Sequence, residues 1–584
     1  MASLPILKIL EESHVSPPPA TVHDGVLPLT FFDIIWLSFS PVHHLFFYEL
    51  PSVTKTHFIE TIVPNLKQSL SITLQHFFPF SGNLIVFPDR KPEIRYAEGD
   101  SVAFTVAEST LDFDDLIGNH PRECGKFYCL IPLSPESTKE LDHVKISVFS
   151  VQVTLFPNSG ISIGMTNHHT LGDATTRFCF LKAWTSIARS GSDESFLANG
   201  TLPVFDRVVN YPKIDEIYLK NLEVETTFFK KEFQPPRLSE PTDKVRATFI
   251  LTRIVIDRLK KWVLTRIPTL PYVSSFTVLC AYVWSCIAKS RNDELEMFGF
   301  MVDCRVRIDP PIPAAYFGNC VALCMSTAKT DLLTGNEGFL NAAKLLGENL
   351  HMMLTHENGV VTDRWPFDGL FSQGMPTTKM GVAGTPKLKF YDTDFGWGRP
   401  VKHETISIDY NDSVSLSACK DSNGDLEIGS GKADVAADVA AEMGGMVGQS
   451  GVDDELHLSV SRNSFEDIQG INGWNLEIWH VSIHRFWKAI SGVLSLYPCR
   501  LRNQKFWREN KVLECAKLLG ENLHKMLTDK DGVMKEKWAY MGLVAQGMPM
   551  TSTGVAKTPK LRFYDMNFGR KWEAKKAKMD LDGL

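Results

Sequence analysis

The sequence of 584 residues lacks a long apolar run. Its most apolar stretch, Phe276–Ala288, is too short to cross a bilayer. Pro5, Glu11 and Glu12 interrupt the N-terminal segment, where a secretory signal would need an unbroken apolar core. We therefore expect a soluble protein of the cytosol without a membrane partner.

Metal-binding and disulfide patterns are also missing. The eleven cysteines are irregularly spaced and form no CxxC pair. Cys320 and Cys324 lie four apart, but no second pair of Cys or His follows them at zinc-finger spacing. Reduced, buried thiols are typical of a cytosolic protein. We expect no structural metal and no bound cofactor.

Basic residues are slightly outnumbered, since 61 Lys and Arg face 68 Asp and Glu for a net charge of −7. A protein that binds nucleic acid without sequence preference carries a basic face, so the charge argues against such a partner. The 37 Phe, 12 Trp and 13 Tyr exclude a disordered chain. At roughly 100–200 residues per domain, the length predicts two to four domains. We also expect a monomer.

The C-terminal part of the sequence contains an internal repeat. Ala343–Gly396 recurs as Ala516–Gly569 without a gap, and 34 of the 54 aligned positions are identical. A single long duplication is not a solenoid, which needs several short repeats. The Gly-rich, acidic segment Lys432–Ser450 separates the copies. We expect a coherent protein up to residue 432 and an extension over 433–584.

Before this extension, sequence patterns predict strands and helices without a strict alternation. Periodicity and turn residues predict helices over Thr56–Phe77 and Ala174–Ala188, a hairpin of Leu84–Phe87 with Glu93–Tyr96, and strands over Val144–Phe156 and Ile161–Thr166. This mixture indicates an α/β fold. The polar, Gly- and Ser-rich stretch 188–202 indicates a crossover between two halves.

A candidate catalytic motif follows the strand predicted for Ile161–Thr166. It reads Asn167-His168-His169-Thr170-Leu171-Gly172-Asp173. A histidine at a strand end, before a glycine turn, exposes an imidazole that can act as a general base near pH 7. We expect Asp173 to cap the following helix or to pair with an arginine. The motif alone leaves open that both histidines are ordinary turn residues and Asp173 only a cap.

A second motif, Asp394-Phe395-Gly396-Trp397-Gly398, has glycines on both sides of a tryptophan. It predicts a tight loop in which backbone approaches backbone. A kinase-type DFG is excluded, because a Gly-rich loop, an HRD and a downstream APE are missing. Alone, the motif is more typical of a packing loop than of a catalytic one.

Together, HTLGD at 169–173, YFGNC at 316–320 and DFGWG at 394–398 resemble the signatures of the plant BAHD acyltransferases. YFGNC resembles the branch that acylates anthocyanins and phenolic glucosides, and the resemblance covers about residues 1–430. It implies an α/β fold of two similar chloramphenicol-acetyltransferase-like domains with a central solvent channel. Those domains would be 1–190 and 216–432, joined by a crossover loop at 191–215.

The resemblance also implies catalytic and structural roles. His169 would be the general base in acyl transfer from an acyl-CoA co-substrate to a hydroxyl group, and Asp173 would pair with Arg305. Asp394 is grouped with the catalytic residues in some descriptions of the family. The residues expected to hold the architecture of the second motif are Trp397, Gly396 and Gly398.

Further residues would bind the acyl donor. Arg177 follows His169 by two helical turns. In the malonyl-using members an arginine here pairs with the free malonyl carboxylate, which suits a guanidinium fork. Lys260, Ser274 and Ser275 stand where the family places contacts with CoA.

Two departures from the family pattern are visible. The closing helix expected after Leu426-Glu427-Ile428-Gly429 is replaced by KADVAADVAAEMGG. The repeat carries Asn567-Phe568-Gly569-Arg570-Lys571 in place of DFGWG, and no second HxxxD precedes it. The degenerate copy therefore cannot be a second active site.

The expected function is transfer of a malonyl group from malonyl-CoA to a sugar hydroxyl of a phenolic, flavonoid or anthocyanin glucoside. Three alternatives remain open. They are an acyltransferase that uses another acyl-CoA, a condensation-type or chloramphenicol-acetyltransferase-like enzyme, and a degenerate acyltransferase fold that only binds ligands.

Overall fold

The computed structural model describes residues 6–431, with gaps at 133–136, 231–236, 239–243, 271–272, 290–293, 357–358, 363–364, 367–377, 411–412 and 423. All of these residues belong to the first of two compact units, Met1–Asp467. The segment Lys432–Ser450, the second copy of the repeat and the rest of the extension 433–584 lie outside the described residues.

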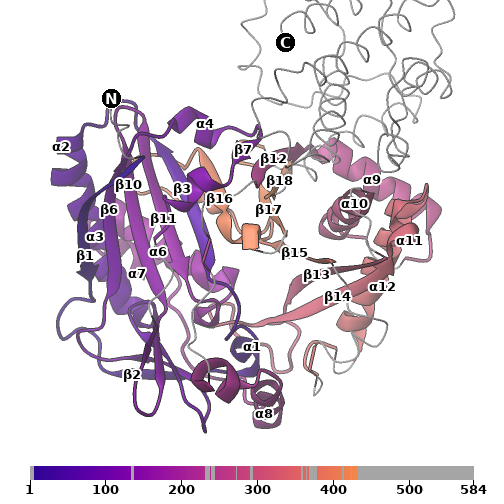
Figure 1. Cartoon of the computed structure of the whole chain (residues 1–584), viewed down its shortest axis with the longest axis horizontal. Helices are drawn as coiled ribbons and strands as arrows, with labels where there is room; N and C mark the ends of the chain where they lie inside the picture. Colours follow the sequence, from indigo (N-terminus) through magenta and orange to yellow (C-terminus); the bar gives the residue numbers. More distant parts are fainter. Residues whose placement is uncertain are drawn as a thin grey trace, which may run out of the picture. The chain divides into compact units, whose positions relative to one another are not determined.

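A six-stranded sheet forms the centre of the N-terminal half (Figure 1). Its order is β1 (Leu7–Val15), β6 (Val102–Ser109), β10 (Phe149–Phe156), β11 (Gly160–Asn167), β3 (Val42–Glu49) and β16 (Lys402–Thr405). Only β10 and β6 pair in parallel. Helices α3 (Val63–His76) and α6 (Ala174–Ser190) share one apolar core with this sheet. The sheet and the two helices together position the end of β11, where the first motif begins.

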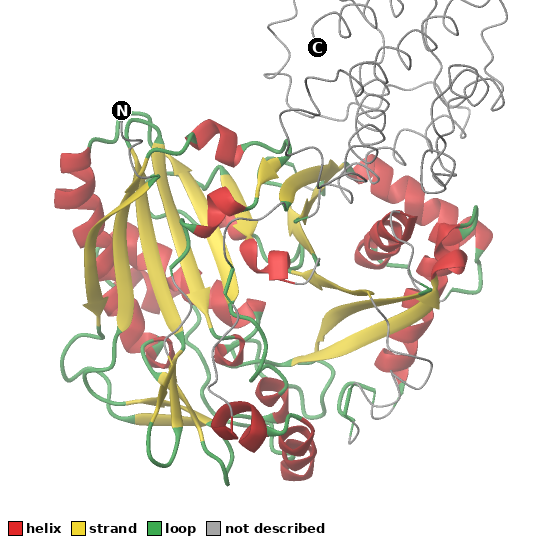
Figure 2. Ribbon diagram, in the orientation of Figure 1, coloured by secondary structure: helices red, strands yellow, loops and turns green. Residues whose placement is uncertain are grey.

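A seven-stranded mixed sheet lies in the C-terminal half (Figures 1 and 2). Its order is β14 (Val321–Lys329), β13 (Leu295–Asp303), β15 (Thr378–Ala383), β17 (Val414–Ala418), β18 (Leu426–Ser430), β12 (Val245–Leu251) and β7 (Arg122–Glu123). The helices α9 (Arg253–Arg266), α10 (Ser275–Lys289) and α12 (Gly338–Thr355) pack with it around a second core.

A smaller antiparallel sheet has the order β2 (Gly25–Pro28), β5 (Glu93–Tyr96), β4 (Asn83–Val86), β9 (Val144–Ser147) and β8 (Ser137–Lys139). The shorter helical elements are α1 (Phe31–Ile34), α2 (Lys55–His57), η1 (Phe58–Ile62), η2 (Phe78–Phe80), α4 (Phe113–Ile117), α5 (Gly125–Tyr128), η3 (His169–Leu171), α7 (Glu194–Asn199), α8 (Pro212–Asn221), η4 (Glu225–Lys230), α11 (Thr330–Thr334), η5 (Phe390–Asp392) and η6 (Ile406–Tyr410). Among the described residues, no helix is both long and apolar enough to cross a membrane.

Most of the predicted elements are confirmed. The pattern at Thr56–Phe77 corresponds to one continuous helical run of α2, η1 and α3, and the predicted hairpin is the β4–β5 pair. The strand predicted for Val144–Phe156 is instead two strands that break at Val148, with β9 in the small sheet and β10 in the large one. The apolar side chains occupy even positions up to Val148 and odd positions from Phe149, so the phase of the alternation changes at the break. The single predicted strand overlooked this shift of one residue.

The predicted crossover loop at 191–215 is not wholly irregular, because it contains α7 and the start of α8. Phe196 of α7 is buried, and its ring lies 5.5 Å from that of His76 and 6.3 Å from that of Phe77. A short helix forms here because it buries one aromatic side chain against α3. Because the stretch is otherwise polar, its composition did not indicate that Phe196 would be buried.

The two large sheets exchange strands across the predicted division of the chain. Strand β16 lies late in the sequence but pairs with β3 of the N-terminal sheet, and β7 lies early but pairs with β12 of the C-terminal sheet. The domain boundaries at 190 and 216 remain a prediction. The sheets themselves do not separate at those residues.

A buried group of charges lies where the strands are exchanged. Glu404 of β16 is 2.8 Å from Arg122 of β7 and 3.5 Å from Arg246 of β12, and all three side chains are almost fully enclosed. Burial alone would raise the pKa of Glu404, but the attraction of Arg122, Arg246 and Lys402 outweighs it and lowers that pKa to about 2. The ionised carboxylate therefore links strands from both halves of the chain.

We expect Glu404→Gln to lower the free energy of unfolding by about 3–5 kcal/mol, because the buried Arg122 loses its counter-charge and Arg246 keeps only Asp409, 3.6 Å away. The pKa of Glu404 is depressed in the folded protein. Its contribution is therefore complete above the ordinary carboxyl pKa of about 4.5 and is lost as the pH falls towards 2. The measurement is a urea titration at pH 7 and at pH 3, where the difference between the variant and the wild type should shrink.

The matched control is Asp257→Asn, which breaks an exposed ion pair between Asp257 and Arg253 on α9. An exposed pair of this kind contributes at most about 0.5 kcal/mol. If Glu404→Gln and Asp257→Asn gave the same urea midpoint, the buried group would not link the two sheets.

Candidate active site

The first motif begins where β11 ends. Asn167 is the last residue of β11, paired with Val42 of β3. The side chain of His168, the next residue, contacts Thr170 of the motif. Its Nδ1 lies 2.8 Å from the Thr170 hydroxyl oxygen and accepts a hydrogen bond from the Thr170 backbone N–H. Asp173 caps α6 by accepting a hydrogen bond of 3.1 Å from the backbone N–H of Thr176. The predicted order of strand, turn and capped helix is confirmed.

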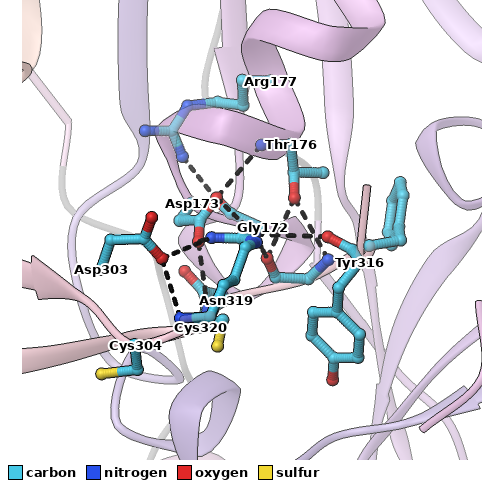
Figure 3. A network of polar contacts seen from close by, with 12 residues as sticks. Gly172, Asp173, Thr176, Arg177, Asp303, Cys304, Tyr316, Asn319 and Cys320 are labelled. Carbon is cyan, nitrogen blue, oxygen red and sulfur yellow. Dashed lines mark hydrogen bonds and ion pairs between the residues drawn. The ribbon is translucent and has the colours of Figure 1, made fainter. Parts of the chain in front are cut away.

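Asp173 faces Arg305 and the backbone of the YFGNC segment. Figure 3 shows Asn319 and Cys320 of that segment beside Asp173. Arg305 donates from Nη1 to Oδ2 at 2.8 Å and from Nη2 to Oδ1 at 3.2 Å, which is the two-bond geometry that suits a guanidinium and a carboxylate. The backbone N–H of Cys320 donates a third bond to Oδ2 at 3.1 Å. Both side chains of the pair are nearly fully enclosed. The Asp173 carboxylate is thus occupied by structural contacts, as the family resemblance implies.

The YFGNC segment requires its glycine. Gly318 has a φ of +122°, and a Cβ at this position would lie 2.6 Å from the Arg207 guanidinium. The carbonyl of Gly318 accepts from the Thr176 hydroxyl at 3.0 Å and from Arg305 at 3.4 Å. This glycine lets the loop approach the first turn of α6, where Figure 3 shows Tyr316 of the loop beside Thr176.

Asn319 holds the backbone of the motif histidine. Its side-chain N–H donates to the carbonyl of His169 at 3.1 Å and to Asp33 at 3.0 Å, and it is completely buried. Asp33 also accepts from the backbone N–H of Asn319 at 2.9 Å. The sequence showed Asn319 within YFGNC, but nothing local indicated that it would reach His169.

The His169 imidazole stacks on Trp36, with ring centroids 3.8 Å apart and planes tilted by 9°. Among the described residues, the ring nitrogen Nδ1 is buried without a hydrogen-bond partner. Burial, and next the positive charge of Arg177, hold the pKa of His169 well below its ordinary value. The ring is therefore neutral at pH 7 and able to accept a proton. Trp36 is a site residue that the sequence patterns did not single out.

The charged side chain of Arg177 lies close to this neutral histidine. Its Nη1 donates to the carbonyl of Gly172 at 2.5 Å (Figure 3), and its Nε is buried without a partner. Burial lowers the pKa of Arg177 to about 10, so the side chain stays charged at pH 7. Among the described residues, no carboxylate lies within ion-pair distance of it. The arrangement can bind an anionic group next to His169.

The second motif forms a tight loop, as predicted. The carboxylate of Asp394 accepts from the backbone N–H groups of Gly396 at 2.7 Å and Gly398 at 2.9 Å. Both glycines have positive φ values, +104° and +95°, which other residues rarely adopt. Trp397 stacks on Phe395, with ring centroids 5.5 Å apart. Asp394 is thus the residue that closes the loop.

The catalytic role expected for Asp394 is inconsistent with its place in the fold. The loop packs against Tyr48, which pairs with Ile161 near the start of β11. His169 follows the opposite end of that strand, about 20 Å away at 3.3 Å per residue. A carboxylate at that distance cannot reach the substrate of His169.

The residues expected to contact CoA lie in the C-terminal half. The Ser274 hydroxyl accepts from the backbone N–H of Thr277 at 2.9 Å and so caps α10, whose first residue is Ser275. Lys260 lies on α9, which packs with α10 in the second core. No hydrogen bond between described residues joins Lys260 to either serine, and their role in binding CoA remains a prediction. Within the described residues, no group of three or more His, Cys, Asp or Glu could hold a metal ion.

Comparisons with known proteins identify the family. A family model described as the Transferase family matches residues 7–429. This chain belongs to the Transferase family, the family of the BAHD acyltransferases. It is 56% identical over 444 residues to a malonyl-coenzyme A:anthocyanin 3-O-glucoside-6''-O-malonyltransferase of Dahlia pinnata, covering 74% of this chain and 95% of that protein. It is 41% identical over 422 residues to phenolic glucoside malonyltransferase 1 of Nicotiana tabacum, covering 70% of this chain and 91% of that protein.

The fold of this acyltransferase also resembles a solved structure. Vinorine synthase matches with a TM-score of 0.52 and 20% identity, over 75% of this chain and 98% of that chain. At this identity the likeness concerns the fold alone, and it agrees with the α/β architecture expected from the motifs.

Proposed function

We propose that this acyltransferase transfers a malonyl group from malonyl-CoA to a sugar hydroxyl of a phenolic, flavonoid or anthocyanin glucoside. The observation that carries the proposal is Arg177, a partly buried guanidinium beside the neutral imidazole of His169 that has no carboxylate within ion-pair distance among the described residues. A free malonyl carboxylate would supply that partner, whereas an acetyl or aromatic acyl group would not. The names of the Dahlia and Nicotiana relatives support the same donor and the same class of acceptor.

In the proposed reaction, Nε2 of His169 takes the proton of the acceptor hydroxyl. The hydroxyl oxygen attacks the thioester carbonyl carbon, the carbon–sulfur bond breaks, and the proton passes to the sulfur of the leaving CoA. No acyl-enzyme is needed, because the thioester is already activated. Asn319 and the Asp173–Arg305 pair hold the backbone on either side of His169. Trp36 fixes the plane of the imidazole.

The remaining parts of the proposal concern the setting of this reaction. Lys260, Ser274 and Ser275 would contact CoA, and the two substrates would meet at His169 in a solvent channel between the halves. The enzyme would act as a monomer in the cytosol. Incubation with malonyl-, acetyl- and coumaroyl-CoA against phenolic and flavonoid glucosides, with products identified by mass, tests the donor and the acceptor together. Turnover with none of these pairs would favour the degenerate binding protein.

We expect Arg177→Ala to raise the KM for malonyl-CoA by about 10- to 100-fold, since a hydrogen-bonded charge contributes about 1.5–3 kcal/mol. Activity with acetyl-CoA should change much less, so the donor preference shifts towards acetyl-CoA. Removal of the cation should also raise the pKa of His169, because the Arg177 charge is one of the causes that lower it. The acid limb of kcat/KM with acetyl-CoA should therefore move to higher pH.

Arg189→Ala serves as the control, because Arg189 lies exposed in the last turn of the same helix. Donor ratios that are equal in wild type, Arg177→Ala and Arg189→Ala would overturn the malonyl donor. The broader assignment as an acyltransferase would stand.

A further inference from the structure

A pair of buried histidines lies close to the proposed donor site. Nδ1 of His44, on β3, is 2.9 Å from Nε2 of His403, on β16, and the two rings stack with centroids 5.2 Å apart. Both side chains are more than nine-tenths enclosed. The other nitrogen of His44, Nε2, is buried and has no hydrogen-bond partner in the part of the chain that the structure describes. Burial of a polar nitrogen without a hydrogen-bond partner normally destabilises a protein by about 1–3 kcal/mol. A ligand that forms a hydrogen bond with this nitrogen would remove that cost.

Strand register places His44 level with Arg177. Side chains alternate along β3, so His44 shares a face with Tyr48, and that face packs on α6. Tyr48 contacts Phe395, and Phe395 contacts Trp184 of α6. From Tyr48, His44 lies four residues back along β3, a distance of about 13 Å. From Trp184, Arg177 lies seven residues back along α6, a distance of about 10 Å. The two similar displacements bring His44 and Arg177 to the same level.

An aromatic bridge agrees with this placement. The Phe390 ring lies 5.4 Å from that of His44 and 5.3 Å from that of Phe178, the neighbour of Arg177 on α6. Burial, and after it the positive charges of His403 and Arg177, keep the pKa of His44 well below its ordinary value. The His44 ring is therefore neutral, and it lies close enough to Arg177 for that charge to lower its pKa.

The chemistry of a neutral histidine pair limits what Nε2 can do. One proton lies between His44 and His403. If His403 donates it, Nδ1 of His44 is the acceptor and the His44 proton lies on Nε2. A carboxylate oxygen beside Arg177 favours that arrangement, because it accepts from the Nε2–H. Hydrogen bonds to a carboxylate are roughly twice as strong as bonds between neutral groups.

We propose that His44 is a specificity-determining residue for the acyl donor: with Arg177, its Nε2–H binds the free carboxylate of the acyl group, and His403 holds its ring in place. This inference rests on the proposed function, since it assumes a donor with a second carboxylate. It names a second polar contact for that carboxylate, from a strand that precedes the HTLGD motif by more than a hundred residues.

The test compares two substitutions that keep different nitrogens of the ring. His44→Asn retains an amide near the position of Nδ1 and can still bond to His403, but it lacks the group at Nε2. His44→Gln places an amide N–H near Nε2. The readout is kcat/KM for malonyl-CoA divided by kcat/KM for acetyl-CoA, measured with one acceptor. Because the ratio is taken within one preparation, a lower folded fraction cancels.

We expect His44→Asn to lower this ratio about tenfold, mainly by raising the KM for malonyl-CoA. His44→Gln should stay within about threefold of the wild type. Calorimetric binding of malonyl-CoA and acetyl-CoA, in a His169→Ala background that prevents turnover, should show the same order without any chemistry.

An unchanged ratio in His44→Asn would overturn the inference, and so would an equal fall in both variants, because the latter would mean that only the shape of the ring matters. The wild-type ratio and that of Arg177→Ala separate this failure from failure of the proposed function. If the wild type prefers malonyl-CoA and Arg177→Ala abolishes the preference, an unchanged His44→Asn ratio rejects the role of His44 alone. If the wild type shows no preference for malonyl-CoA, the proposed donor and this inference both fail.

Discussion

His169→Ala is expected to lower kcat by about 10²–10⁴-fold while the fold stays intact, which is the range that a positioned general base contributes. The ring makes one stacking contact, with Trp36, and its Nδ1 has no partner, so its loss leaves few structural contacts unmade. The measurement is single-turnover kinetics with malonyl-CoA, together with a urea titration that shows the folded fraction. Because burial and Arg177 keep the pKa of His169 well below 6.5, the acid limb of wild-type kcat/KM should also lie well below pH 6.5.

His168→Asn is the matched control. His168 is buried, and its Nδ1 bonds to the hydroxyl and the backbone of Thr170, so an asparagine amide replaces the nitrogen that the turn uses. We expect less than a tenfold loss of kcat in this variant. Equal losses at positions 168 and 169 would show that the imidazole assigned as the base is the wrong one.

Local chemistry explains which parts of the site could be predicted. The N-cap at Asp173, the glycine turn before it and the tight loop around Gly396 and Gly398 depend on neighbouring residues, and each was predicted from them. The same reasoning predicted an exposed turn, whereas Thr170 and Leu171 are fully buried. The pairing of Asp173 with Arg305 joins positions 132 residues apart. Only the resemblance to a family indicated it, because no periodicity connects a helix cap to a distant arginine.

The residues that sequence reasoning missed reach the site through long-range pairing. Trp36 and Asn319 meet at His169 from opposite halves of the chain. His44 meets His403 only because β16 crosses to β3, and a strand exchange leaves no local pattern in the sequence. The error at Asp394 has the same origin. Its motif predicted the loop correctly, but only the register of β3 against β11 shows how far that loop lies from His169.

Asp173→Asn is expected to lower the free energy of unfolding by about 3–5 kcal/mol, because it removes the buried counter-charge of Arg305 and leaves only the half-exposed carboxylate of Asp303, 3.3 Å away. Asparagine is as good a helix cap as aspartate, so the bond from the Thr176 N–H survives and the loss isolates the ion pair. Turnover should fall as well, since the contact that positions the turn after His169 is weakened. Urea titration and kinetics on the same preparation measure both effects.

Arg305→Met and the double variant complete a thermodynamic cycle. Methionine keeps a long side chain without charge, so each single variant leaves one charge of the pair without its buried partner, whereas the double variant removes both charges. The double variant should therefore be destabilised by clearly less than the sum of the singles, with a coupling of about 1–3 kcal/mol. Additive losses would mean that the two residues act independently. An Asp173→Asn protein with the wild-type urea midpoint and a selective loss of kcat would contradict the structural role, and it would instead indicate that Asp173 takes part in the chemistry directly.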